Sequence, residues 1–167
     1  LRLAGPCHCV RLTSNVRPPM KVRLLQKSEL NALLALYQHL HETDVALPDA
    51  ATLDAVWDEA LSNPRCRYFG GFDGDELVSS CTIMVIPNLT RGARPYGVVE
   101  NVVTHRAHRG KGWGRAVLAQ AREFAWSQKC YKVMLLTGSK DEATFKFYEA
   151  AGFDRHGKQA FIAKPAA

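Results

Sequence analysis

The stretch RGKGWGR, residues 109–115, places three glycines at alternate positions among basic residues. Glycine in a helix interior costs about 1 kcal/mol relative to alanine, so helix propensity alone does not explain this pattern. Two explanations are open. The stretch could be a turn before a helix, or a loop whose bare backbone wraps around an anion.

The residues after the loop favour the second explanation. Apolar residues recur there at helical spacing, at Trp113, Val117, Ala121 and Phe124. This periodicity predicts an amphipathic helix that begins at the loop. The start of such a helix offers unpaired N–H groups and the positive end of the helix dipole, and glycines let further N–H groups converge. Positive charge is added by Arg109, Lys111 and Arg115. The loop therefore suits a pyrophosphate.

Two common phosphate-binding motifs do not fit this loop. A P-loop requires Lys followed by Ser or Thr, but Gly112 follows Lys111. A dinucleotide-binding fold requires G-x-G-x-x-G and an acidic residue at the end of the next strand, and that strand ends LLTGS here. ATP and NAD are therefore not the expected ligands.

Hydrophobic periodicity and turn residues predict an α/β (α+β) domain of order β-α-α-β-β-β-α-β-α-β, with a mixed sheet flanked by helices. The first half is expected to contain a strand at 20–26, a helix capped by Ser28 that reaches Leu40, and a helix that begins at Thr52 and stops at Asn63-Pro64. Strands at 66–72 and 76–86, joined by a hairpin at 73–75, and a strand at 96–104 should follow. The second half is expected to contain the helix from Trp113, a strand at 132–137, a helix at 141–153 ended by Gly152, and a closing hairpin about Gly157.

Length and composition indicate one domain. The 167 residues, 47% of them hydrophobic, suffice for one core, which we assign to residues 20–167. Residues 1–19 carry three arginines and no acidic residue, and we expect them to be a disordered extension outside the fold, with Met20 as an alternative start. No apolar stretch reaches the roughly 18 residues that cross a membrane.

The net charge of +6 would by itself suggest nucleic acid, but half of it comes from the extension. The rest of the chain has no long basic run, so we expect neither a nucleic-acid nor a membrane partner. The five cysteines are odd in number and lack a disulfide framework, which favours reduced thiols and a cytoplasmic location. Cys7-His8-Cys9 has no second pair at zinc-finger spacing, so no metal site is expected.

Two motifs together carry a family resemblance. VVTHRAHRGKGWGRAVL at 102–118, followed by FYEAAGF at 147–153, resembles the GNAT superfamily of N-acetyltransferases, and the similarity extends over residues 20–164. This resemblance implies acetyl-CoA as the acetyl donor. It also implies that the backbone of Val102 and Val103 pairs with the pantetheine arm, and that the loop holds the pyrophosphate through Arg109, Gly110, Lys111, Gly112, Trp113, Gly114 and Arg115.

Acetyl transfer to an amine requires a base, because a free alkylamine has a pKa near 10.4. Glu100 is the candidate: it lies within VVENVV, which the pattern predicts to be a strand buried on both faces, and the similar family position often serves as base. The alternative is a structural ion pair with Arg91 or Arg94. The resemblance makes Tyr148 the acid that protonates the departing sulfur. Its alternative is a core aromatic.

Several other residues have two possible roles. His105 and His108 could contact phosphate or face solvent, and Trp113 is expected in the core. Asp141 stands where many family members have asparagine, and we expect it to cap the following helix. A cluster of His39, His41, Glu42 and Asp44 lies where the family usually builds its acceptor pocket, and could contact substrate or end a helix in solvent.

The leading hypothesis is an enzyme that transfers acetyl from acetyl-CoA directly to a primary amine of a small molecule or protein in a ternary complex. The alternative is a non-catalytic acyl-CoA-binding or sensing module on the same fold. The sequence leaves open the identity of the acceptor and whether the protein is a homodimer.

Overall fold

A computed structural model describes residues 20–40 and 45–165. The extension predicted at residues 1–19, and His41, Glu42 and Asp44, lie outside the described residues. The elements are β1 (Lys21–Leu24), a 3-10 turn η1 (Lys27–Glu29), α1 (Leu30–Tyr37), α2 (Ala50–Ser62), β2 (Cys66–Asp73), β3 (Glu76–Ile86), β4 (Tyr96–Thr104), a 3-10 turn η2 (Arg106–His108), α3 (Trp113–Ser127), β5 (Val133–Leu135) and α4 (Glu142–Ala150).

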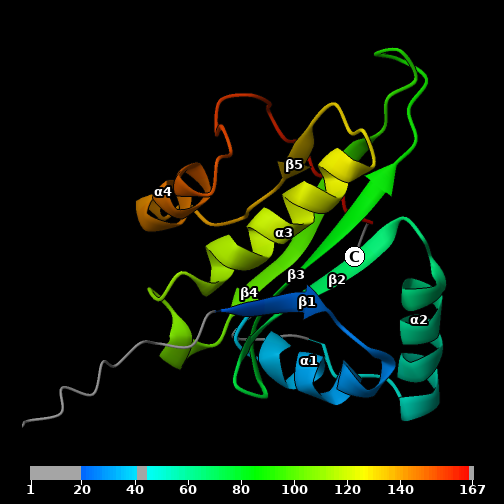
Figure 1. The fold of residues 1–167 in the computed structure, drawn as a ribbon, viewed down its shortest axis with the longest axis vertical. Helices are drawn as coiled ribbons and strands as arrows, with labels where there is room; N and C mark the ends of the chain where they lie inside the picture. The colour runs from blue at the N-terminus through cyan, green and yellow to red at the C-terminus, as the bar shows by residue number, and fades with distance from the viewer. Residues whose placement is uncertain (1–19, 41–44, 166–167) are drawn as a thin grey trace, which may run out of the picture.

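The five strands form one sheet in the order β1-β2-β3-β4-β5 (Figure 1). All neighbours are antiparallel except β4 and β5, which are parallel. The predicted hairpin at Asp73-Gly74-Asp75 joins β2 to β3, and Gly74 has the positive φ of 62° that such a turn requires. The prediction of a mixed, mostly antiparallel sheet flanked by helices is confirmed.

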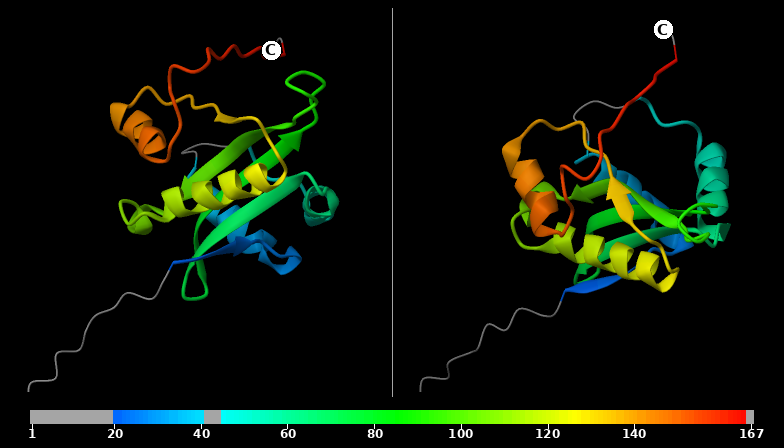
Figure 2. Two further views of the ribbon diagram at one scale, coloured as in Figure 1. Left: turned by 45° about the horizontal axis from the view of Figure 1, so that its top comes forward. Right: turned by 90° about the horizontal axis from the view of Figure 1, so that it is seen from above.

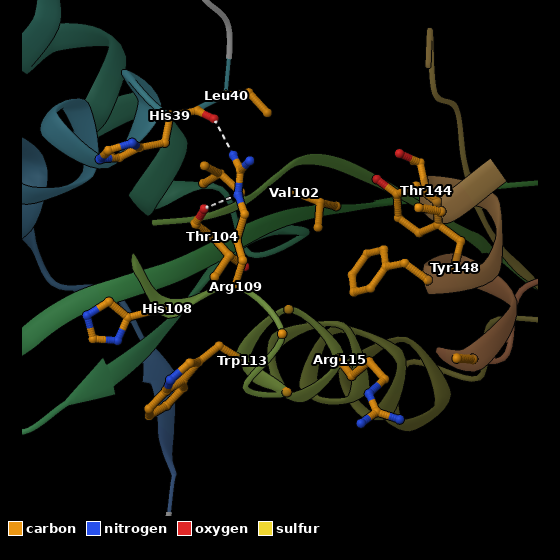
Figure 3. A pocket seen from close by; sticks show the side chains of 17 residues that line it. His39, Leu40, Val102, Thr104, His108, Arg109, Trp113, Arg115, Thr144 and Tyr148 are labelled. Atoms are coloured by element: carbon orange, nitrogen blue, oxygen red, sulfur yellow. Dashed lines mark hydrogen bonds between the residues drawn. The ribbon is translucent and has the colours of Figure 1, made fainter. Parts of the chain in front are cut away.

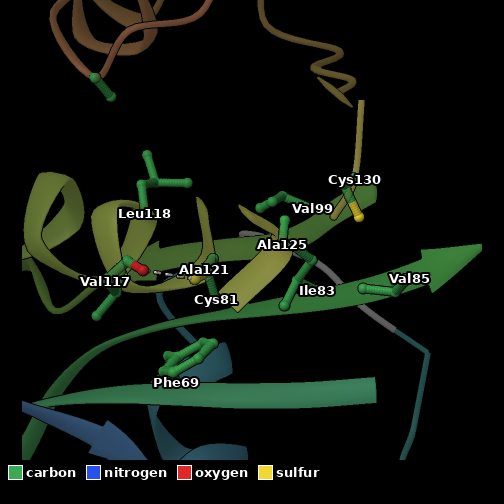
Figure 4. Close-up of a cluster of buried hydrophobic side chains, with 11 residues drawn as sticks. Phe69, Cys81, Ile83, Val85, Val99, Val117, Leu118, Ala121, Ala125 and Cys130 are labelled. Atoms are coloured by element: carbon green, nitrogen blue, oxygen red, sulfur yellow. Dashed lines mark hydrogen bonds between the residues drawn. The ribbon is translucent and has the colours of Figure 1, made fainter. Parts of the chain in front are cut away.

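Helices cover both faces of this sheet. On one face, α3 packs against the strands through Val117, Leu118, Ala121 and Ala125, which are buried against Ile83 and Val99 among others (Figure 4). On the other face, a second cluster joins α1 and α2 to the sheet through Leu33, Leu36 and Trp57. The helix α4 lies beside α3 and contributes Phe147 and Tyr148 to the edge of the first cluster (Figure 2).

Local capping explains where the helices begin. The Asp49 carboxylate accepts a hydrogen bond of 2.9 Å from the Thr52 N–H, so α2 begins at Ala50, slightly before the predicted start. The first predicted helix begins later than expected because Gln26 and Glu29 form a capping box around the η1 turn, and α1 starts at Leu30. Asp141 caps α4 by accepting from the Ala143 N–H at 3.1 Å, as predicted.

The closing hairpin predicted about Gly157 is wrong. Within the described part of the chain after α4, residues 151–165 contain turns but no strand. Asp154 folds this region into a local turn instead, since its carboxylate accepts from the His156 N–H at 2.9 Å and its carbonyl accepts from the Gly157 N–H at 3.4 Å. Phe161 and Ile162, which follow the predicted turn, are 91% and 75% exposed. The final β of the predicted order is therefore absent from the described residues.

No helix in the described ranges is long and apolar enough to cross a membrane. Three of the five cysteines fall in these ranges, and Cys66, Cys81 and Cys130 are all buried free thiols.

Candidate active site

A cleft of about 750 Å³ opens where β4, the start of α3 and α4 meet (Figure 3). The end of α1 closes one side of it. The cleft is lined by His39, Leu40, residues 102–104 of β4, residues 108–110, residues 112–115, and Ala143, Thr144, Phe147, Tyr148 and Ala150 of α4. All the predicted cofactor-binding residues except Lys111 are in this lining. Glu100 lies two residues before the lining on β4.

The glycine loop forms one wall of this cleft. Gly110 and Gly112 have φ of 71° and 94°, which side-chain-bearing residues rarely adopt, and a Cβ at Gly110 would meet nothing within 4 Å. Gly112 is the N-cap of α3, and no side chain caps it. The first N–H groups of α3 therefore have no partner within the helix and face the cleft with the positive end of its dipole. This arrangement fits a pyrophosphate.

Arg109 ties this loop to its surroundings. Its Nε donates to the Thr104 carbonyl at 3.2 Å, and its Nη2 donates to the His39 carbonyl at 3.0 Å (Figure 3). The second bond connects the glycine loop to the residues at the end of α1, although Arg109 and His39 are 70 residues apart in sequence. Arg109 thus holds the loop against both β4 and α1, and its remaining N–H groups are left for an anion.

The outer edge of β4 is open beside the cleft. The strand β5 pairs with β4 only at Gly97, Val98 and Val99, so the backbone of β4 from Glu100 onward has no described strand on that side. Val102 is partly buried there and Val103 is buried. An open strand edge offers N–H and C=O groups to an extended amide chain, which is the chemistry of pantetheine.

A bulge in β4 determines where Glu100 lies. Ser80 of β3 is opposite Val103, and Thr82 is opposite Glu100, so two residues of β4, Asn101 and Val102, face the single Cys81. Asn101 adopts a φ of 52° at the bulge. The extra residue shifts the alternation of side chains, and Glu100 and Asn101 are both exposed.

The prediction that this strand is buried on both faces is therefore wrong at Glu100. The alternative ion pair also finds no support, because no described arginine pairs with Glu100. Arg94 instead donates to the carbonyls of Lys129 and Cys130 at 3.3 and 3.2 Å. The sequence did contain a signal. In VVENVV a polar pair separates two valine pairs, which breaks the period of two that a regular strand shows.

Tyr148 lies on α4 and faces the cleft. Its ring packs against Phe147 at 4.9 Å and Phe153 at 6.4 Å between ring centroids. Burial raises the pKa of its phenol, and the negative charge of Glu100 raises it further. The phenol therefore stays protonated at neutral pH, and the two predicted catalytic residues lie within electrostatic reach of each other.

The histidines at the cleft make contacts that the sequence did not predict. His105 caps η2 by accepting from the Ala107 N–H at 3.2 Å, and its ring lies 4.1 Å from that of His39. His108 lies 3.4 Å from the Asp73 carboxylate. Trp113 is buried, as expected, although it also lines the cleft. Thr144 and Phe147 were missed because they belong to the face of α4 that only the fold directs toward the loop.

The match to a family model identifies the protein family of this chain. Residues 31–153 match the model of the acetyltransferase (GNAT) family. The chain is a member of the GNAT acetyltransferase family. It therefore takes acetyl-CoA as its acetyl donor and transfers the acetyl group to an amine. The comparisons give no support to the non-catalytic alternative.

Individual GNAT relatives agree with this assignment. A curated relative from Trypanosoma brucei brucei, glucosamine 6-phosphate N-acetyltransferase, is 32% identical over 84% of this chain and 92% of its own length. A solved acetyltransferase-family structure from Agrobacterium tumefaciens str. C58 is 40% identical, with a TM-score of 0.80 over 86% of this chain and 99% of that one. A Trypanosoma brucei acetyltransferase structure is 30% identical, with a TM-score of 0.73 over 87% and 99% of the two chains.

Proposed function

We propose that this acetyltransferase acts on the primary amine of an amino sugar phosphate, with Glu100 as the base and Tyr148 as the acid. The observation that carries the mechanism is the bulge of β4, which exposes Glu100 next to the open strand edge. The acceptor class is supported by the trypanosomal relative, which is named as a glucosamine 6-phosphate N-acetyltransferase.

In this proposal the chain's backbone holds the donor. The amides of residues 110–115 bind the pyrophosphate, and the edge of β4 at Val102 and Val103 pairs with the pantetheine arm. Bound acetyl-CoA supplies a thioester whose carbonyl carbon the amine attacks. The protein's part is to hold that carbon beside Glu100, to accept the amine proton and to return a proton to the sulfur.

Glu100 is suited to the first proton transfer because its carboxylate is exposed and no described cation pairs with it. It accepts a proton from the acceptor amine, directly or through one water molecule, which makes the nitrogen lone pair available. Tyr148 is suited to the second transfer because its raised pKa keeps the phenol protonated. It donates this proton to the sulfur as the C–S bond breaks.

We also propose direct transfer, without an acetylated enzyme. Cys66, Cys81 and Cys130 are buried, and none of them lines the cleft. Burial raises the pKa of each of these thiols, that of Cys81 to about 12, so they stay protonated and are poor nucleophiles. As reduced thiols they also support a cytoplasmic location. The absence of nucleic-acid and membrane partners remains a prediction. Whether the protein is a homodimer remains open.

Tyr148→Phe tests the role of the acid. The change removes only a hydroxyl group, so the ring contacts with Phe147 and Phe153 should survive. Turnover should fall about tenfold, because solvent can replace part of the general acid catalysis. The loss should be equal from pH 6 to pH 9, since the raised pKa keeps the phenol protonated over that range. Unchanged turnover together with a lower melting temperature would make Tyr148 a packing residue only.

A panel of amines tests the acceptor class. Purified protein is assayed for thiol release with glucosamine 6-phosphate, glucosamine, an aminoglycoside, spermidine and a lysine peptide at equal concentrations. We expect the highest kcat/KM with glucosamine 6-phosphate and a lower value with glucosamine, because the phosphate adds binding energy. A higher kcat/KM with any of the other amines would overturn the proposed acceptor class while leaving the acetyltransferase assignment intact.

A further inference from the structure

Three buried hydroxyl groups on the α1/α2 face of the sheet have no hydrogen bond of standard geometry among the described residues. They are the Tyr37 Oη on α1 and the Ser80 Oγ and Thr82 Oγ1 on β3, and Thr82 is only 8% exposed. A buried hydroxyl without a partner destabilises a fold, and a valine of similar shape would pack at position 82 without this cost. Of these three hydroxyls, those of Tyr37 and Thr82 lie where a functional neighbour explains their presence.

The sheet register directs one of these groups toward the proposed base. Tyr68 of β2 is directly opposite Thr82 of β3, and Thr82 is directly opposite Glu100 of β4. Residues opposite each other share a face of the sheet, with Cβ atoms about 5 Å apart. Tyr68 packs edge-to-face on Trp57 of α2 at 4.9 Å, which identifies the face as the one that α1 and α2 cover. Tyr68, Thr82 and Glu100 therefore form a row of polar side chains that crosses three strands on this face of the sheet.

Tyr37 joins this row from the helix above it. Burial raises the pKa of its hydroxyl, whereas hydrogen bonding by the side chains of Thr82 and Asn101 lowers this pKa, so its oxygen lies near both. The Thr82 side chain likewise lowers the pKa of the Tyr68 hydroxyl, so it lies near that oxygen too. The hydroxyls of Tyr37, Tyr68 and Thr82, which we call the hydroxyl cluster, therefore meet one strand behind Glu100.

We propose that Thr82 and Tyr37 are positioning residues that orient the Glu100 carboxylate toward the acceptor amine. The Thr82 hydroxyl donates to the carboxylate, directly or through one water molecule, and the Tyr37 hydroxyl donates to the Thr82 oxygen. This order follows from the chemistry, because an ionised carboxylate only accepts and a protonated phenol is the stronger donor of the two hydroxyls. The inference rests on the proposed role of Glu100.

The test compares Thr82→Val, Thr82→Ser and Ser80→Ala in the full chain. Ser80 provides the matched control: it lies on β3, is fully buried, and its Oγ also lacks a described partner, but it is opposite Val103 instead of Glu100. Ser80→Ala removes a hydroxyl without a partner and should keep or raise the melting temperature, and Thr82→Val should leave the melting temperature nearly unchanged. Only Thr82→Val should lower kcat, about 10- to 100-fold, with the KM for acetyl-CoA nearly unchanged. Thr82→Ser keeps the hydroxyl and should recover most of the activity.

Tyr37→Phe and the double variant with Thr82→Val extend the test. Because both hydroxyls act through one carboxylate, their effects on kcat should be strongly non-additive. Full turnover in Thr82→Val would overturn the inference, and so would a loss that Thr82→Ser does not recover or that follows a fall in melting temperature. If Glu100→Gln is also fully active, the proposed function has failed. If only Glu100→Gln is impaired, the hydroxyl cluster has no role and Glu100 keeps its own.

Discussion

Glu100→Gln is expected to lower kcat about 10²- to 10⁴-fold while the affinity for acetyl-CoA stays close to that of the unchanged enzyme. Glutamine keeps the size of the side chain and its hydrogen-bonding capacity but cannot accept the amine proton. Glu100 does not line the cleft that would hold the donor, so donor binding should not depend on its charge. Since the side chain is exposed and has no described ion-pair partner, the melting temperature should change little.

Three measurements separate this outcome from a structural role: turnover with a responsive amine, acetyl-CoA affinity and melting temperature. Glu123→Gln is the matched control, because Glu123 is exposed on α3 and does not line the cleft. It should match the unchanged enzyme in all three. A folded Glu100→Gln protein with full turnover from pH 6 to pH 9 would remove Glu100 from the mechanism and assign the base to solvent or to the substrate.

Gly110→Val is expected to weaken acetyl-CoA binding about 10- to 100-fold. A β-branched residue at a φ of 71° is strained by about 1–3 kcal/mol, which the loop can relieve by turning its N–H groups away from the pyrophosphate. At 100 times its dissociation constant, acetyl-CoA should stabilise the unchanged enzyme by about 2.7 kcal/mol, a shift of a few degrees in melting temperature. At the same ligand concentration, the stabilisation of the variant should fall to about 0.4–1.4 kcal/mol, with a correspondingly smaller shift in melting temperature.

Gly92→Val separates loss of the binding site from general backbone strain. Gly92 has the same φ of 71°, and a Cβ there also meets nothing within 4 Å, but it lies in the loop between β3 and β4 and outside the cleft. Both variants should melt at a similarly lowered temperature without ligand. Only Gly92→Val should keep the full shift with acetyl-CoA. Equal shifts in the two variants would mean that the glycine loop is only a turn.

The sequence predicted most of the fold because its strong signals are local. Apolar residues at helical spacing from Trp113 onward predicted α3, and Asp73-Gly74 predicted the β2–β3 hairpin. The end of the chain could not be predicted in the same way. Phe161 and Ile162 have high strand propensity, but a strand also needs a neighbour to supply ladder hydrogen bonds, and local sequence does not reveal that the Asp154 turn directs the chain elsewhere.

The site was predictable where backbone chemistry forms it. The loop glycines could be identified because few other functions require positive φ at alternate positions. The surroundings of Glu100 could not be predicted in this way, because one inserted residue changes which face of the sheet each later side chain occupies. Arg109 illustrates a further limit. Its contact with the His39 carbonyl joins residues far apart in the chain, and no periodicity or motif connects the two.

The bulge at Asn101 also constrains how the gene for this enzyme can vary. Substitutions at this position leave the course of the strand unchanged, and residues that tolerate a φ of 52°, such as glycine or aspartate, suit it best. An in-frame deletion of one codon in this stretch is a different kind of change. It would let β4 pair regularly, with Glu100 still opposite Thr82 and Val103 still opposite Ser80, but it would remove the bulge beside Glu100. Length in this part of β4 is therefore under stronger constraint than residue identity.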